Sequence, residues 1–287
     1  MDLCNEKDIK ALLGRHGFRF SKSMGQNFLI EGWVPRDIAD ASGADQGCGV
    51  LEIGPGIGPL TVQLAQRAGK VASIELDKAL LPILEETLAP YDNVTVVPGD
   101  AMKLDLAALA AEQFGSLIPL ACANLPYNIT TPVITALIEA GCFKAITVMI
   151  QREVALRICA EPGTSDYGAF SVFCQYHTTP ELLFQVPPEC FLPAPKVISA
   201  VIRLTPRETP PQDLVDEAFF FRVVKAAFAQ RRKTLLNGLT SAFGNQLSKD
   251  LLRQAIVDAG LPESIRGERL GIPEFAALAR ALQGLAP

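Results

Sequence analysis

Residues 48–61 read CGVLEIGPGIGPLT, an apolar run that leads into a glycine-rich turn and then into a helical pattern. Glycines at a strand-to-helix turn (here Gly54, Gly56 and Gly58) let a ligand lie against the backbone near a helix N-terminus. Their spacing is G-x-G-x-G, one residue shorter than the G-x-G-x-x-G of dinucleotide-binding proteins. Taken alone, the turn predicts a strand–turn–helix unit that either binds a ligand or is a plain structural turn.

Outward from this turn, short apolar runs alternate with helical patterns, which is typical of an α/β fold with a parallel sheet. Five strands are expected at 49–54, 71–76, 94–99, 117–125 and 145–151, with helices near 59–68, 78–89, 105–113 and 131–141. Two more strands are expected at 182–186 and 197–204. The proline-rich segment between those two is too short and stiff for a helical crossover, so it favours an antiparallel return. The sequence therefore predicts a seven-stranded mixed sheet.

The pattern changes after residue 206. The segment TPRETPPQD (205–213) is rich in proline and polar residues and is expected to be a linker. Helical patterns then follow at roughly 214–229, 233–243, 248–259 and 273–284. We therefore expect a first domain over 1–206, which includes an N-terminal segment 1–48, and a small all-α domain over 212–287.

The composition is that of a globular protein, with 287 residues of which 49% are hydrophobic. No apolar run reaches the length of about eighteen residues that a membrane span needs. The N-terminal MDLCNEKDIK resembles neither a signal peptide nor a transit peptide. Seven scattered cysteines without a CxxC pair favour reduced thiols and a cytoplasmic protein. Only His16 and His177 are histidines, so we expect neither a metal site nor a histidine-based triad.

The net charge of −5 argues against a nucleic-acid-binding protein, but the charges are unevenly distributed. One basic cluster, within residues 222–233, contains no acid, and a second lies within residues 7–22. Two basic clusters on an otherwise acidic protein are typical of a protein that binds phosphate groups on one face. An ordinary solvated helix face is the alternative. The residues of the cluster in 222–233 are Arg222, Lys225, Arg231, Arg232 and Lys233.

Two acidic residues follow the next expected strands. Glu75 ends the second strand, 21 positions after Gly54, where a carboxylate can accept hydrogen bonds from both hydroxyls of a ribose. Alternatively, Glu75 caps the next helix. Asp100 follows the third strand and can accept a hydrogen bond from the amino group of adenine. Together with the glycines, these residues predict a nucleoside pocket, but they do not separate NAD from S-adenosylmethionine.

The fourth strand ends in Asn124-Leu125-Pro126-Tyr127, which indicates the chemistry. The amino nitrogen of adenine is a poor nucleophile, because its lone pair is delocalised into the ring. An asparagine oxygen and a main-chain carbonyl that accept its N–H groups favour the tetrahedral geometry needed for attack. The proline fixes the turn and removes a backbone donor, and Tyr127 offers a flat face for an extruded base. A plain turn with a packing tyrosine is the alternative.

On these motifs the chain resembles the ribosomal RNA adenine dimethyltransferase family over nearly its whole length. Further motifs that carry the resemblance are KSMGQNFL (22–29), FLPAPKVISAV (191–201) and FAQRRKTL (228–235). The resemblance implies a Rossmann-like class I methyltransferase with a small all-α C-terminal domain and S-adenosylmethionine as cofactor. Within the family, the chain looks most like bacterial enzymes that dimethylate two adjacent adenosines near the 3′ end of 16S rRNA in the small (30S) ribosomal subunit or its precursor. A monomer is expected.

The resemblance also implies roles for individual residues. The helical domain is expected to contact rRNA through the basic cluster of residues 222–233, and Tyr127 and Phe191 are expected to sandwich the target base. The catalytic set implied is Asn124, Leu125, Pro126, Tyr127 and Phe191. The cofactor-binding set implied is Asn27, Leu29, Gly54, Gly56, Glu75, Leu76, Asp100, Ala101 and Asn124.

Four other functions remain open from the sequence. The nearest is dimethylation of 23S rRNA, which confers macrolide resistance; residues 228–239 and 266–270 look closer to the 16S enzymes. An assembly or transcription factor without catalytic activity is disfavoured by the intact Asn124, Pro126 and Tyr127. An NAD-dependent oxidoreductase is disfavoured by the glycine spacing. A DNA adenine methyltransferase is disfavoured by the C-terminal domain.

Overall fold

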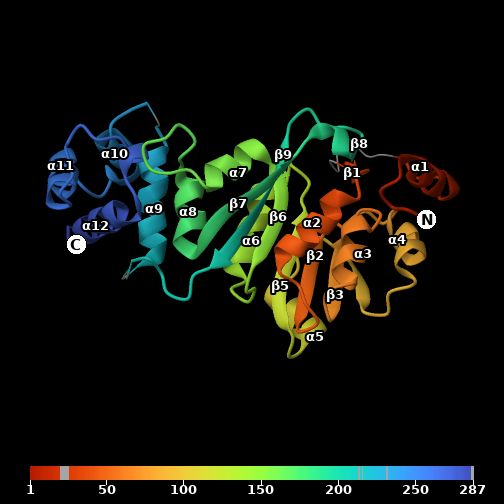
Figure 1. Cartoon of the computed structure of the whole chain (residues 1–287). Helices are drawn as coiled ribbons and strands as arrows, with labels where there is room; N and C mark the ends of the chain where they lie inside the picture. Colours follow the sequence, from red (N-terminus) through yellow and green to blue (C-terminus); the bar gives the residue numbers. More distant parts are fainter. Residues whose placement is uncertain (20–25, 213, 215, 231, 286–287) are drawn as a thin grey trace. The chain divides into compact units, whose positions relative to one another are not determined.

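The computed structural model describes residues 1–19, 26–212, 214, 216–230 and 232–285, and the chain forms two compact units (Figure 1). Unit 1 consists of Met1–Ala155 and Pro180–Pro206, and unit 2 of Leu156–Thr179 and Arg207–Pro287. Unit 1 ends at Pro206, where the sequence placed the end of the first domain, whereas residues 156–179, which the sequence placed in that domain, group with the helical unit. The functional assignment of the two domains stays a prediction.

Unit 1 is built on a seven-stranded sheet with the strand order β4-β3-β2-β5-β6-β9-β7. Neighbouring strands from β4 to β6 pair in parallel, whereas β9 runs antiparallel to β6. The predicted mixed sheet is therefore confirmed. The strands are β2 (Cys48–Ile53), β3 (Lys70–Glu75), β4 (Val94–Pro98), β5 (Ile118–Asn124), β6 (Ile146–Gln151), β7 (Thr178–Val186) and β9 (Ser199–Pro206).

Four helices follow successive strands, as the alternating pattern predicts: α3 (Pro59–Ala65), α4 (Leu81–Leu88), α5 (Leu106–Phe114) and α6 (Thr130–Glu139). Their starts have local causes. Pro59 occupies the first position of α3, where its missing N–H is not needed. Asp105 caps α5 by accepting a hydrogen bond from the backbone N–H of Ala108. All six residues of β2 are buried, as expected of a parallel strand that is covered on both faces.

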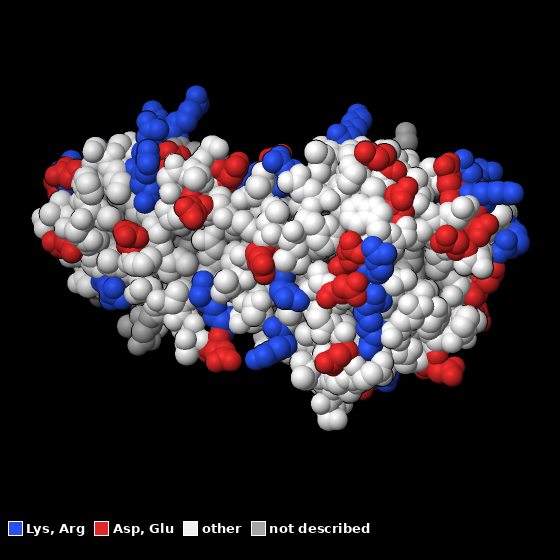
Figure 2. Space-filling view, viewed as in Figure 1, with Lys and Arg blue, Asp and Glu red and all other residues white. Residues whose placement is uncertain are grey.

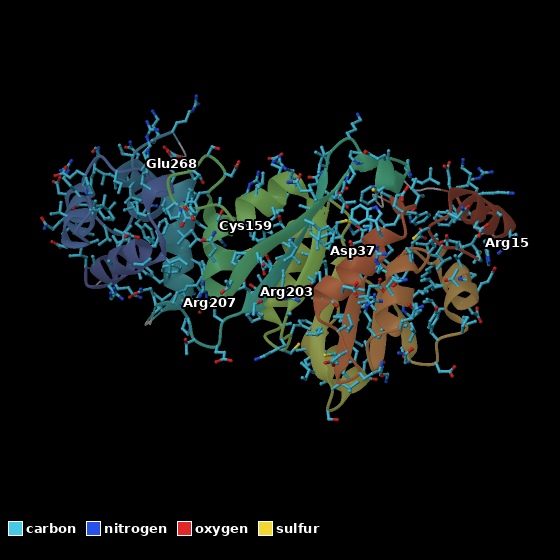
Figure 3. All side chains as sticks on the ribbon, in the orientation of Figure 1. Arg15, Asp37, Cys159, Arg203, Arg207 and Glu268 are labelled. Atoms are coloured by element: carbon cyan, nitrogen blue, oxygen red, sulfur yellow. The ribbon has the colours of Figure 1, made fainter. Side chains whose placement is uncertain are left out.

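The N-terminal segment adds α1 (Glu6–Arg15) and α2 (Trp33–Ser42), and α7 (Arg152–Ile158) follows β6. Helix α2 packs against α3 and against β5 and β6. Arg203 of β9 donates a hydrogen bond to the carbonyl of Ala41 in α2 (Figure 3). Arg15, at the end of α1, pairs with Glu86 of α4. These contacts tie the segment before the first sheet strand to the body of unit 1.

A second, two-stranded sheet joins segments that are far apart in the sequence. Strand β1 (Phe28–Leu29) pairs antiparallel with β8 (Phe191–Leu192), which follows the short 3-10 helix η2 (Pro188–Cys190). Leu29 lies opposite Phe191, and the N–H of Ile30 donates to the carbonyl of Cys190 at 2.9 Å. The pairing brings two of the sequence motifs of the candidate site next to each other.

Unit 2 contains α8 (Ala169–His177), α9 (Glu217–Phe228), α10 (Leu235–Phe243), α11 (Lys249–Asp258), α12 (Ile272–Gln283) and the short 3-10 helix η3 (Gly267–Arg269). The four helices predicted after residue 213 are confirmed. Tyr167 and Tyr176 are buried in the same cluster as Phe220 of α9 and Phe275 of α12. This shared apolar core explains why residues 156–179 group with the C-terminal helices.

None of the helices in the described ranges combines the length and the apolar character that a membrane span requires. Among the residues that the structure describes, no cluster of His, Cys, Asp or Glu side chains is arranged to hold a metal ion. All seven cysteines have free thiols.

Candidate active site

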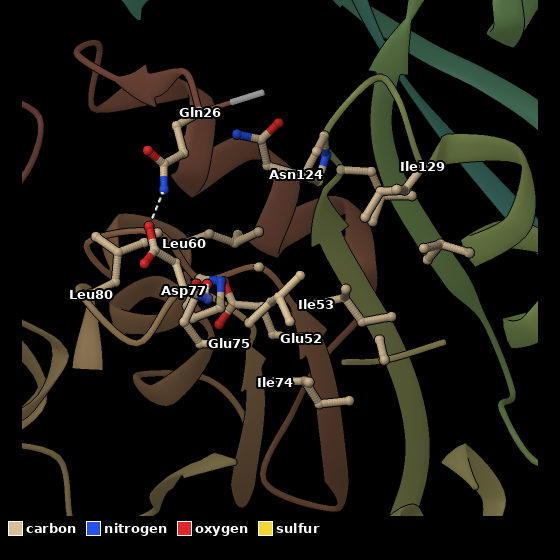
Figure 4. Close-up of a pocket in the computed structure, with 18 of the residues that line it drawn as sticks. Gln26, Glu52, Ile53, Leu60, Ile74, Glu75, Asp77, Leu80, Asn124 and Ile129 are labelled. Atoms are coloured by element: carbon tan, nitrogen blue, oxygen red, sulfur yellow. Dashed lines mark hydrogen bonds between the residues drawn. The ribbon is translucent and has the colours of Figure 1, made fainter. Parts of the chain in front are cut away.

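One pocket of unit 1 lies at the carboxyl ends of β2, β3 and β5 and the turn after β4 (Figure 4). Ligands of open α/β sheets bind at this edge. Every residue that the sequence assigned to a cofactor or catalytic role lines this pocket: Asn27, Leu29, Gly54, Gly56, Glu75, Leu76, Asp100, Ala101, Asn124, Leu125, Pro126, Tyr127 and Phe191. The structure brings them together; what each one binds stays a prediction.

The glycine-rich turn adopts a backbone that other residues rarely take. Gly54, Gly56 and Gly58 have φ angles of 72°, 62° and 96°, in the left-handed region that favours glycine. A Cβ on Gly56 would lie 3.4 Å from two ring carbons of Phe28. The turn is therefore held in a fixed shape, with the β1 segment packed closely against it.

Glu75 ends β3 and is 6% exposed. Its Oε1 accepts a hydrogen bond from the N–H of Asp77 at 2.7 Å, within the turn after β3. Helix α4 begins only at Leu81 and has no side-chain cap, so the alternative role of Glu75 as a helix cap is not found. Burial raises the pKa of Glu75 to about 7, although backbone hydrogen bonds from Asp77 and Gly56 oppose the shift. A carboxyl of this kind becomes ionised when a ligand brings a positive charge or hydrogen-bond donors.

Glu52 also lines the pocket, and the sequence reasoning gave it no role. It is 1% exposed, and its Oε2 accepts hydrogen bonds from the hydroxyls of Thr61 and Ser73, both at 2.6 Å. Burial raises its pKa to about 7, against the lowering effect of the two hydroxyls. A glutamate inside the otherwise apolar run GVLEIG was the available signal, because a buried acid needs partners.

Asp100 follows β4 in a more open environment. Its Oδ1 accepts a hydrogen bond from the N–H of Met102 at 3.0 Å, and Lys103 Nζ lies 3.8 Å from Oδ2. Leu76 and Met102, which line the same part of the pocket, are 52% and 42% exposed. This end of the pocket thus offers apolar surface beside a carboxylate.

The Asn124 turn is held by main-chain hydrogen bonds. The N–H of Leu125 donates to the carbonyl of Met149 on β6 at 3.1 Å, and the N–H of Ile129 donates to the carbonyl of Pro126 at 3.2 Å. The Asn124 side chain stands at the end of β5 beside the pocket (Figure 4). No hydrogen bond joins it to another of the described residues, so its amide is available to a ligand.

Tyr127 and Phe191 differ in how they face the pocket. Tyr127 is partly buried, and its hydroxyl lies 2.7 Å from Ser199 Oγ. Burial raises the pKa of Tyr127, so the phenol is protonated at neutral pH. Phe191 is 3% exposed and packs in the core of the large sheet with residues such as Val186 and Met149. Tyr127 therefore offers more accessible surface to a base than Phe191 does, and the expected sandwich between the two side chains stays a prediction.

The segment at residues 26–29 crosses the pocket and is attached at both ends. Gln26 Nε2 donates to Asp77 Oδ2 at 2.7 Å, just beyond Glu75 (Figure 4). At the other end, Leu29 pairs with Phe191. The preceding residues of the KSMGQNFL motif, 22–25, lie outside the described residues.

The basic cluster belongs to unit 2, where lysine and arginine side chains project near the turn from α9 into α10 (Figure 2). Lys225, Arg232 and Lys233 are exposed. Arg222 lies over the ring of Phe243, with 4.5 Å between guanidinium carbon and ring centroid, so it also has a packing role. Arg231 lies outside the described residues.

A comparison with protein-family models identifies the chain. The model described as ribosomal RNA adenine dimethylase matches residues 17–263. The chain belongs to this family. Membership confirms the resemblance drawn from the motifs and makes the protein an rRNA adenine dimethyltransferase by family.

Curated relatives are similar to this chain over nearly its whole length. The chain is 47% identical to "Ribosomal RNA small subunit methyltransferase A" of Geobacillus thermodenitrificans, with 99% of this chain and 98% of the relative covered. It is 49% identical to the protein of the same name from Streptococcus pneumoniae strain P1031, with 99% of each covered.

Solved structures share the fold. A dimethyladenosine transferase from Plasmodium falciparum has a TM-score of 0.71 and 26% identity, with 87% of this chain and 95% of the other covered. The 23S rRNA methyltransferase ErmE has a TM-score of 0.66 and 25% identity, with 89% and 99% covered. The predicted Rossmann-like class I methyltransferase fold is confirmed.

Proposed function

We propose that the protein transfers methyl groups from S-adenosylmethionine to the N6 amino groups of two adjacent adenosines near the 3′ end of 16S rRNA, forming N6,N6-dimethyladenosine. The substrate would be the small ribosomal subunit or its precursor, and the enzyme would act as a cytoplasmic monomer in ribosome biogenesis. One observation carries the proposal: the Asn124 turn faces the same pocket as two buried carboxylates and a glycine-rich turn.

The pocket suits the chemistry of this cofactor. Glu75 can accept hydrogen bonds from the two ribose hydroxyls, and the exposed apolar side chains of Leu76 and Met102 can cover an adenine ring whose amino group donates to Asp100. Glu52 and Glu75 are carboxyls whose pKa burial raises to about 7. A positively charged ligand would favour their ionised forms. The residues present thus fit a cationic nucleoside.

At the other end, the Asn124 Oδ1 and a main-chain carbonyl of the turn would accept the two N–H groups of the target adenine. The Leu125 carbonyl is the candidate, since the Pro126 carbonyl already accepts from Ile129 N–H and the Thr130 hydroxyl. These acceptors shift the nitrogen toward tetrahedral geometry and free its lone pair. When bound, the cofactor supplies an electrophilic methyl group.

Each transfer releases one proton from the amino nitrogen. Tyr127, whose pKa is raised by burial, stays protonated and cannot accept it, so the proton passes to water. The role of Tyr127 would be to stack against the base and hold it in line with the methyl group. Positioning and polarisation then account for the chemistry without a general base.

Two parts of the chain would divide the work. The span 1–206, apart from residues 156–179, would carry the cofactor pocket and the chemistry. The helical span 212–287 would contact rRNA phosphates through Lys225, Arg232 and Lys233, with Arg222 and Arg231 beside them.

Dimethylation of 23S rRNA is the second candidate, because the 23S rRNA methyltransferase ErmE shares the fold at a TM-score of 0.66. The higher identity to the small-subunit enzymes, 47–49% against 25%, favours the 16S substrate.

The test is to incubate the protein with labelled S-adenosylmethionine and separately with small and large ribosomal subunits that lack the modification, and then to map the labelled nucleotides. We expect label on two adjacent adenosines of 16S rRNA. Label on 23S rRNA would support the second candidate, and no transfer to either subunit would contradict both.

A further inference from the structure

Tyr127 is attached to unit 1 at both ends of its side chain. Its backbone belongs to the turn after β5, and its hydroxyl forms a hydrogen bond of 2.7 Å with Ser199 Oγ, 72 residues further along the chain. A tyrosine joined to the protein by its backbone alone can rotate about two side-chain bonds. The second attachment fixes the direction in which the ring points, and because a phenolic O–H prefers to lie in the plane of its ring, it also favours a ring plane that contains the serine oxygen.

Ser199 is well placed to act as such an anchor. It is the first residue of β9, lies opposite Gln151 of β6 in the large sheet and is 0% exposed. The carbonyl of the preceding residue, Ile198, accepts a hydrogen bond from the N–H of Arg152 at 2.9 Å. The serine oxygen is therefore fixed by the sheet on one side and reaches the pocket through Tyr127 on the other.

We infer that Ser199 is a positioning residue for methyl transfer: its hydroxyl holds the Tyr127 ring in the orientation that receives the target base. The inference rests on the proposed function, since it assigns Tyr127 to the base. Ser199 itself does not line the pocket, so it acts through the tyrosine and touches neither substrate nor cofactor.

A double-mutant cycle tests this inference, because either Ser199→Ala or Tyr127→Phe removes the same hydrogen bond. We expect each variant to lower kcat for an unmodified small subunit by about three- to tenfold, the range for one neutral hydrogen bond. The double variant should lose no more than the worse single one. The Kd for S-adenosylhomocysteine should change less than twofold, and Ser199→Thr, which retains a hydroxyl, should restore part of the loss.

Ser42→Ala is the matched control for folding. Ser42 is 2% exposed and its hydroxyl donates to the carbonyl of Ala39 in α2, away from the pocket. This variant should lose thermal stability much as Ser199→Ala does while retaining kcat.

The inference would be overturned by independent, multiplicative losses in the double variant, by a Ser199→Ala loss without a Tyr127→Phe loss, or by equal losses in kcat and cofactor affinity. If the wild-type protein transfers label but both single variants match it, this inference alone is wrong. If the wild type transfers no label to any ribosomal subunit, the proposed function itself fails.

Discussion

At the end of the pocket formed by β2 and β3, the polar groups include two buried carboxyls, Glu52 and Glu75. At the end formed by β5, they are the neutral side chains of Asn124 and Tyr127. We call these the acidic end and the neutral end. Burial raises the pKa of both glutamates to about 7, whereas the neutral end presents acceptors and a flat ring. Under the proposed function, the charge of the acidic end would serve to bind the cofactor, and the geometry of the neutral end would serve the reaction.

The largest expected effect is at the neutral end. Asn124→Ala would remove one proposed acceptor of the adenine amino group, and it should lower methyl transfer by about 100- to 1000-fold, as the loss of one polarising group typically does. Cofactor affinity should stay within roughly tenfold. Single-turnover transfer and calorimetric titration with S-adenosylhomocysteine measure the two quantities. A parallel loss of affinity would show that the two ends are not separable.

The next effect is at the acidic end. Glu75→Ala should weaken S-adenosylhomocysteine binding by about 10- to 100-fold, the value of hydrogen bonds to a charged group, with little loss of kcat at saturating cofactor. Glu85→Ala is the matched control, because Glu85 is an exposed glutamate of α4. A loss confined to kcat would assign Glu75 to the chemistry instead.

Glu52 allows a test by pH. A cationic ligand favours the ionised carboxylates, whose pKa is about 7 in the free protein. Cofactor affinity should therefore be highest above pH 7 and fall as the pH falls from 8 to 6, by up to about tenfold for each carboxylate that must be ionised, since one unit of pKa difference corresponds to a factor of ten. Glu52→Gln should flatten this pH dependence. An unchanged pH profile in the variant would show that Glu52 does not contribute to the pH dependence of cofactor affinity.

Glu52→Gln should also raise the thermal stability of the ligand-free protein at high pH. The folded-state pKa of Glu52 lies above its ordinary value of 4.5, so its contribution to folding is full below pH 4.5 and is lost as the pH rises through 7. Without ligand, Glu52→Gln should melt several degrees above the wild type at pH 8 and close to it at pH 4.5. Equal melting temperatures at both pH values would contradict this account.

Much of the fold and of the pocket could be predicted from the sequence. The apolar runs located all seven strands of the large sheet, and because parallel strands end at one edge, Glu75, Asp100 and Asn124 could be placed in one pocket. The helices α3 to α6 and α9 to α12 followed from their periodicity. Hydrophobic periodicity depends only on residues close together in the sequence, and these helices and strands are long enough to show it.

The remaining features depend on tertiary packing that no local pattern contains. Strands β1 and β8 have two residues each and pair across more than half of the chain. Glu52 obtains its partners from Thr61 and Ser73, which lie 9 and 21 residues away on other elements. Residues 156–179 joined the helical unit because Tyr167 and Tyr176 are buried in its core. Each of these three features depends on contacts between residues that are distant in the sequence, so local sequence patterns could not predict it.

The smallest expected effect tests whether the basic cluster, which lies outside the pocket, binds the ribosomal subunit. Arg232→Glu with Lys233→Glu should weaken binding to the small subunit severalfold and flatten its salt dependence, by a slope of about 0.7 to 0.9 for each phosphate that the protein no longer neutralises. Transfer to a short RNA containing the target adenosines should be unchanged, because such an RNA needs only the pocket. Lys249→Glu, at an exposed position of α11, controls for net charge. If transfer to the short RNA fell as much as transfer to the subunit, the basic cluster would act on the chemistry or the fold, and the division between a reacting pocket and a docking surface would be wrong.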